Sequence, residues 1–161
     1  MRILTISGSL QAVSGNGRLL ELAEDASAAA DVEVERSVGV ADLPHFNPDL
    51  DPDATPPAVT AFRAQLARAD AVLIATPEYA HSLPGALKNA LDWIVGSGEF
   101  YDKPVAIVSG VPAAHRGENG RRALEQTLRA HGAKVVLSRS IIHADAQGSI
   151  ASVLAKLTAD R

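Results

Sequence analysis

The feature that most constrains this chain is the alternation of short apolar runs with segments of helical periodicity. Such runs are typical of strands in a parallel sheet with helices on both faces. The predicted strands are residues 2–7, 31–40, 71–75, 105–108 and 134–137. Apolar side chains at helical spacing mark the helices, at 19–26, 59–69, 83–94, 124–128 and 150–157. Right-handed crossovers leave few strand orders, so we expect a three-layer α/β sandwich whose five-stranded parallel sheet has the order 2-1-3-4-5.

Composition narrows the class of protein. A chain of 161 residues favours one domain, residues 1–161. The chain contains no cysteine, which excludes disulfides and thiolate metal sites and is consistent with a reducing cytoplasm. A net charge of −4 argues against nucleic acid as a partner. The first residues turn polar too soon for a signal peptide, and no apolar run approaches the roughly 20 residues of a membrane span. We therefore expect a cytoplasmic protein that acts without nucleic acid or membrane.

The loop after the first predicted strand is rich in groups that suit a phosphate. It contains the hydroxyls of Ser9 and Ser14, the side chain of Asn16 and the Gly15 amide, just before a helix begins. Neither the P-loop pattern nor G-x-G-x-x-G occurs, which disfavours a nucleoside triphosphate or a dinucleotide held as in dehydrogenases. The alternative is an ordinary strand-to-helix turn in which Ser14 or Asn16 caps the helix.

The loop after the third strand, residues 77–82, lies between two prolines and suits a planar heteroaromatic ring, with Tyr79 as a flat partner. The alternatives are half-buried packing for Tyr79, and a salt bridge or a helix N-terminal charge for Glu78. In the order 2-1-3-4-5 the strand order reverses between strands one and three, so the loops after these two strands face one crevice. This convergence is the physical argument that the protein binds a ligand there.

Two segments carry a family resemblance. Residues 8–20, Gly-Ser-Leu-Gln-Ala-Val-Ser-Gly-Asn-Gly-Arg-Leu-Leu, and residues 76–93, which contain Pro-Glu-Tyr-Ala-His-Ser-Leu-Pro-Gly, resemble the two signatures of the NADPH-dependent FMN reductase family. That family includes quinone, chromate and azo-dye reductases and has a flavodoxin-like fold. The resemblance implies an FMN-dependent oxidoreductase, acting as a homodimer or homotetramer, that passes electrons from NADPH or NADH to a small acceptor.

The resemblance also implies which residues hold FMN. The expected phosphate contacts are Ser9, Gln11, Ser14, Gly15 and Asn16. The expected ring contacts are Pro77, Glu78, Tyr79, Ala80 and His81, with Ser109 and Gly110 at the start of a third loop.

Three positions depart from the family pattern. Gln11 stands where arginine is common, Ala80 stands where asparagine is usual, and residues 111–117 lack the usual glycines. His115 or Arg116 could replace a lost contact, although exposed loop positions are the favoured interpretation. These departures bear on the affinity for flavin rather than on the fold.

Flavin chemistry would need no protein acid or base, so no catalytic side chain is assigned. Aromatic residues make up only 4% of the chain, which would leave one ring face open to nicotinamide and acceptor in turn. The alternatives are a non-catalytic flavin-binding electron carrier and a flavin-free sensor or scaffold. Histidine spacing disfavours a metal enzyme, and the absence of G-x-S-x-G disfavours a serine hydrolase.

Two questions stay open from the sequence. No arginine cluster for a 2′-phosphate can be placed, so the choice between NADPH and NADH is undecided. The helix around Trp93 has apolar residues beyond one stripe, Ala90, Trp93 and Val95, as expected of a helix buried on two sides, and this is the physical support for an oligomer.

Overall fold

The computed structural model describes residues 1–51, 53–114 and 116–159, and its strands form one parallel sheet of order β2-β1-β3-β4-β5, as predicted. The strands are β1 (Arg2–Ser7), β2 (Glu33–Arg36), β3 (Ala71–Ala75), β4 (Pro104–Val111) and β5 (Lys134–Ile142). The helices are α1 (Gly15–Ala26), α2 (Pro57–Arg68), α3 (Gly85–Asp92), α4 (Glu118–Ala130) and α5 (Ala146–Ala159). Two short 3₁₀ helices, η1 (Pro48–Leu50) and η2 (His143–Asp145), complete the described elements.

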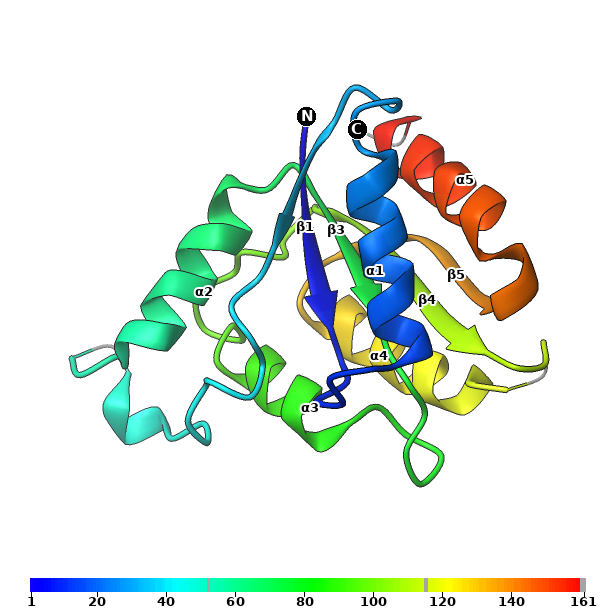
Figure 1. Ribbon diagram of the computed structural model, residues 1–161. Coiled ribbons are helices and arrows are strands. Elements are labelled where there is room, and N and C mark those ends of the chain that lie inside the picture. Colours follow the sequence, from blue (N-terminus) through cyan, green and yellow to red (C-terminus); the bar gives the residue numbers. More distant parts are fainter. Residues whose placement is uncertain (52, 115, 160–161) are drawn as a thin grey trace.

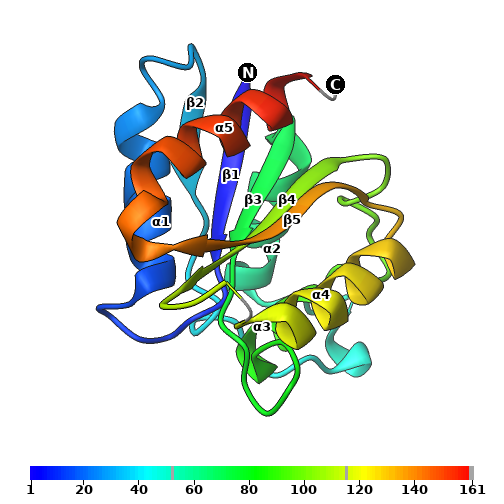
Figure 2. The same ribbon diagram turned by 90° about the vertical axis from the view of Figure 1, so that its right-hand side faces the viewer.

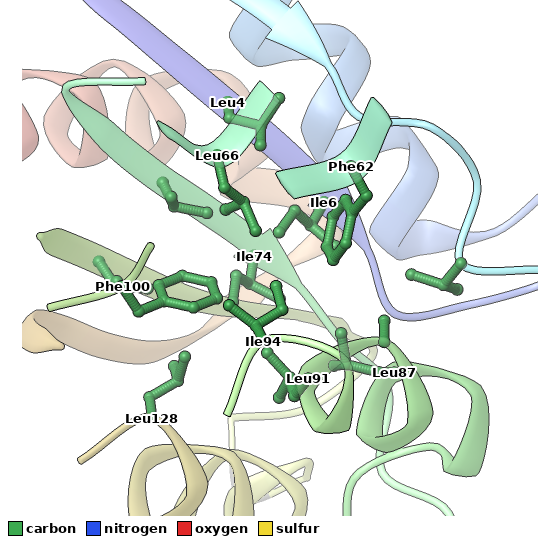
Figure 3. Packing of buried hydrophobic residues seen from close by; sticks show 14 of the residues in the cluster. Leu4, Ile6, Phe62, Leu66, Ile74, Leu87, Leu91, Ile94, Phe100 and Leu128 are labelled. Atoms are coloured by element: carbon green, nitrogen blue, oxygen red, sulfur yellow. The ribbon is translucent and has the colours of Figure 1, made fainter. Parts of the chain in front are cut away.

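Helices cover both faces of the sheet, so the chain forms three layers (Figures 1 and 2). Helices α1 and α5 pack on one face, and α2, α3 and α4 pack on the other. Every residue of the central strand β3 is buried, as expected of a parallel strand covered on both sides. Figure 3 shows the core on the α2–α4 face, where side chains converge from β1, β3, α2 and α3, among them Ile6, Ile74, Phe62 and Leu91. None of the helices in the described residues is long and apolar enough to span a membrane.

The edge strand β2 is shorter than the predicted 31–40. Pairing ends at Arg36, after which the chain turns toward α2. The amide of Val38 donates to Gln65 Oε1 at 2.8 Å, and Val40 is buried in the α2–α4 core. The apolar alternation therefore continues past the strand because the following loop also packs against the core.

Strands β4 and β5 are longer than predicted. Ser109 and Gly110, expected in a third loop, lie in β4, where they pair with Ser140 and Ile141. The glycine and proline of residues 109–112, Ser-Gly-Val-Pro, favour a turn. Pairing with the long neighbouring strand instead extends β4 to Val111. The expected third loop therefore begins after Val111.

The apolar residues beyond the α3 stripe find their cover within the chain. Trp93 is fully buried, its Nε1 donates to the Pro44 carbonyl oxygen at 2.8 Å, and its ring meets Phe46 edge-on at 5.1 Å. Ala90 is also buried, whereas Val95 is 67% exposed. The prediction that these residues mark a partner-covered face is therefore wrong for Trp93 and Ala90, because residues of the same chain, among them Val40, Leu43 and Pro44, cover that side of α3.

Candidate flavin site

The loop after β1 leads directly into the first turn of α1. Ser14 is the N-cap of α1, and its Oγ accepts from the Gly17 amide at 3.0 Å, which confirms the capping interpretation for this residue. The amides of Gly15 and Asn16 lie in the first turn, where a helix provides no acceptor of its own. Ser9 is buried, and its Oγ accepts from the Gln11 amide at 3.1 Å. This segment therefore presents hydroxyls and a positive helix end, which suit an oxyanion.

Asn16 connects this loop to β4 instead of capping α1. Its Oδ1 accepts from the Gly110 amide at 2.9 Å, and the side chain is buried. Gly110 has to be glycine here, because a Cβ would lie 2.7 Å from the backbone carbon and oxygen of Gly15. Ser109 Oγ likewise donates to the Thr76 carbonyl oxygen at 2.7 Å. The structure thus brings Ser109 and Gly110 to the predicted crevice as connections between strand ends.

The loop after β3 forms a tight reverse turn. Tyr79 and Ser82 exchange backbone hydrogen bonds of 3.0 and 2.9 Å, and Ala80 and His81 both have positive φ, 48° and 60°. Two consecutive positive φ values define a type I′ turn, whose first central position favours asparagine. The asparagine usual in the family at position 80 therefore has a conformational reason besides any contact with a ring. Tyr79 is 51% exposed, as in the half-buried interpretation.

Glu78 fixes the start of α4. Its carboxylate accepts from the Gly120 amide at 3.1 Å and from Asn119 Nδ2 at 3.4 Å, and His81 Nδ1 lies 3.3 Å away. The Gly120 hydrogen bond is the main reason that the pKa of Glu78 falls below its usual value. The helix N-terminal interpretation of Glu78 is therefore confirmed, but the helix is α4 and not the one that follows it in sequence.

The two loops leave the sheet side by side. The Gly8 amide donates to the Ala75 carbonyl oxygen at 2.8 Å, and a Cβ on Gly8 would lie 2.7 Å from Thr76 Oγ1. The crevice expected between strands one and three therefore has adjacent walls, with both loops at the same edge of the sheet (Figure 1).

Two cavities open along this edge. One of about 390 Å³ lies at the start of α1 and is lined by Ser14, Gly15 and His143, among others. The other, of about 520 Å³, is lined by Pro77, Glu78, His81, Gly110, Val111, Arg116, Gly117 and Asn119. Both volumes are in the range of small-molecule sites. The side chains of Gln11, Tyr79 and Ala80 are exposed on the two loops.

Sequence reasoning missed several residues of this region. Arg121 is buried and donates through Nη1 to Ser140 Oγ at 2.7 Å. Its position three residues before Leu124, on the buried stripe of α4, was a usable signal. His143 follows the end of β5 and packs against Gly15, a proximity that no local pattern predicts. His115, considered as a compensating contact, lies outside the described residues.

Comparison with known proteins gives the family. Residues 1–147 match the NADPH-dependent FMN reductase family, so the chain belongs to that family. A quinone reductase of Pseudomonas putida is 38% identical over 135 residues, which are 78% of this chain and 68% of the relative. A probable NADPH:quinone oxidoreductase 2 of Oryza sativa is 41% identical over 129 residues, which are 77% of this chain and 61% of the relative.

Solved structures agree on the fold. The flavoenzyme NAD(P)H:(acceptor) oxidoreductase FerB from Paracoccus denitrificans superposes with a TM-score of 0.80 at 24% identity, over 99% of this chain and 98% of that one. Oxidised flavodoxin 1 from Bacillus cereus superposes with a TM-score of 0.70 at 13% identity, again over 99% and 98%. The flavodoxin-like fold is therefore confirmed.

Family membership makes the chain an NAD(P)H-dependent flavoenzyme with FMN as cofactor. The residues present fit that group. Ser14 and the first amides of α1 provide neutral donors for a phosphate. Gln11 supplies no charge where the family commonly has arginine, so the helix dipole and these donors have to stabilise the phosphate.

Proposed function

We propose that this protein passes electrons from NADPH or NADH through FMN to a small acceptor such as a quinone, free flavin, chromate or an azo compound. The observation that carries the proposal is the meeting of the loops after β1 and β3 beside two cavities at one sheet edge. FMN, when bound, supplies the chemistry of hydride acceptance and onward electron transfer. A protein that works in this way needs only to bind and orient its ligands.

The chain's own residues have three roles in this proposal. Ser9, Gln11, Ser14, Gly15 and Asn16 bind the FMN phosphate at the positive end of α1. The backbone of 77–81, fixed by the type I′ turn, borders the flavin ring together with Ser109 and Gly110. Glu78 acts as a positioning residue, because its carboxylate joins this loop to the start of α4. The exposed Tyr79 leaves a ring face open for nicotinamide and acceptor to bind in turn.

The decisive experiment is anaerobic mixing of the FMN-loaded protein with NADPH or NADH, followed by absorbance. We expect rapid loss of the flavin absorbance at about 450 nm. The absorbance should recover when a quinone is added. Flavin that binds but is not reduced by either nucleotide would instead identify an electron carrier. Protein that does not quench FMN fluorescence would favour the flavin-free alternative.

The phosphate subsite has its own test in Ser14→Ala. Removing the hydroxyl should weaken FMN binding by about tenfold, equivalent to ~1.4 kcal/mol. Riboflavin, which lacks the phosphate, should bind the variant as tightly as it binds the wild type. Fluorescence titration with both flavins separates the phosphate contact from the loss of the helix cap, because cap loss would weaken both ligands equally.

A further inference from the structure

The arginines of this chain divide into two groups. Most of those in the described residues pair with a carboxylate, as Arg63 does with Asp51 at 2.6 Å. Within the same described ranges, three form no ion pair with a carboxylate: Arg116, Arg121 and Arg139. Arg139 donates to Ser149 on the α5 side of the sheet. The other two lie together on the α4 side.

A single hydroxyl connects Arg116 and Arg121. Ser140 Oγ donates to the Arg116 carbonyl oxygen at 2.8 Å and accepts from Arg121 Nη1 at 2.7 Å. Arg121 Nη1 also approaches the Arg116 carbonyl oxygen at 3.4 Å. Arg121 is only 9% exposed, and a guanidinium stays charged when it is buried. A buried charge without a carboxylate in direct contact is unfavourable, so this arrangement favours an anion supplied from outside the chain.

The pair borders the 520 Å³ cavity. Arg116 and Gly117 line it, and a Cβ on Gly117 would lie 3.1 Å from Arg121 Nη1, so the buried guanidinium lies directly behind the cavity wall. Glu118, Glu125 and Glu78 act on Arg121 only at longer range, without an ion pair, and the Glu78 carboxylate already accepts from the Gly120 amide. Glu118 is exposed and faces Arg122 at 4.0 Å. Two guanidinium groups without an ion pair to the described residues, in a chain of net charge −4, make this cavity a local exception to the overall charge.

We propose that Arg116, backed by Arg121, binds a phosphate group of the reduced nicotinamide nucleotide at this cavity. The proposal rests on the proposed function and adds the docking site of the electron donor. The FMN phosphate is assigned to the start of α1, on the other side of the Asn16–Gly110 connection, and so it is not the anion expected here. Two parts of the donor have the required chemistry: the pyrophosphate, which NADH and NADPH share, and the 2′-phosphate of NADPH.

The test uses the FMN-loaded enzyme and the exposed residue, since Arg116→Ala leaves the buried Arg121 in place. We expect the KM for the nucleotide to rise at least about tenfold, as for loss of a charged hydrogen bond, with kcat unchanged. Calorimetry with NADP⁺ and NAD⁺ should show a matching loss of affinity, without any turnover. A rise for NADPH and NADP⁺ alone identifies the 2′-phosphate, an equal rise for both pairs identifies the pyrophosphate, and either supports the proposal.

The matched control is Arg129→Ala, which removes a 72% exposed arginine side chain from the last turn of α4. Arg116→Lys should restore part of the affinity, because it keeps the charge but loses the planar fork. The proposal is overturned if Arg116→Ala and Arg129→Ala change nucleotide affinity equally, or if Arg116→Ala weakens FMN binding instead. If the wild type is never reduced by either nucleotide, the proposed function fails separately, and the calorimetric comparison still decides this inference.

Discussion

The turn at Ala80 and His81 shows how one backbone conformation limits residue choice. An alanine at φ 48° occupies the left-handed region, which is unfavourable by about 1 kcal/mol for most L-residues and least so for glycine and asparagine. Ala80→Asn should therefore stabilise the fold by about 0.5–1 kcal/mol. Urea unfolding measures the change. Ala155→Asn, at an exposed position inside α5, is the control and should destabilise by about 0.5 kcal/mol, so equal effects would contradict the turn argument.

Glu78 gives a pH-dependent prediction at the same scale. Its pKa is lowered in the folded state from 4.5, so its contribution to stability is present above that value and is lost as pH falls through the lower folded pKa. Glu78→Gln should reduce the unfolding free energy at pH 7 by about 1 kcal/mol, as for a lost helix cap. The difference from the wild type should shrink as the pH falls from 4.5 through the lower folded pKa, where the wild-type carboxyl becomes protonated in the folded protein as well. A difference that stays unchanged as the pH is lowered to the acid limit of the folded state would exclude this assignment.

At the scale of elements, the start of α1 packs backbone against backbone on the end of β4. Gly110→Ala would place a methyl group 2.7 Å from the Gly15 backbone, and neither element can yield without losing the Asn16 hydrogen bond. We expect a loss of about 1–3 kcal/mol in unfolding free energy, together with weaker FMN binding. Gly148→Ala in α5, where a Cβ meets nothing within 4 Å, should instead stabilise by up to about 1 kcal/mol. A neutral Gly110→Ala would show that the two elements are loosely packed.

Elements were also the level at which sequence reasoning worked best. Strands β1 and β3 match their predicted ranges, because both are apolar runs bounded by polar residues. The ends of β4 and β5 were missed, since pairing between these two strands extends β4 beyond Val108 and β5 beyond Leu137. The role of Glu78 at α4 was missed for a related reason: it joins residues 42 positions apart, and local spacing carries no record of that contact.

For the whole molecule, we retain the expectation of a homodimer or homotetramer. The burial of Trp93 within the chain removes one argument for it, but Leu10, Val13 and Tyr79 leave large apolar side chains exposed on the site loops at 61%, 86% and 51%. Sedimentation equilibrium at micromolar concentration should give two or four times the 16.8 kDa of one chain. Val13→Asp should shift the distribution toward single chains if these side chains are covered by a partner, and Val95→Asp, in the turn after α3, is the comparison. A wild type that sediments as one chain throughout would exclude the oligomer.

The single tryptophan has a practical consequence for every one of these measurements. Trp93 belongs to the α2–α4 core and is held by Pro44 and Phe46, while the α1–α5 layer holds no indole. Intrinsic emission therefore reports the melting of one side of the sheet, whereas circular dichroism averages both. Coincident denaturation curves from the two signals would show that the layers unfold as a cooperative unit. An emission change that lags or leads would instead reveal a partly folded species in which the α1–α5 layer and the indole-bearing layer differ in stability.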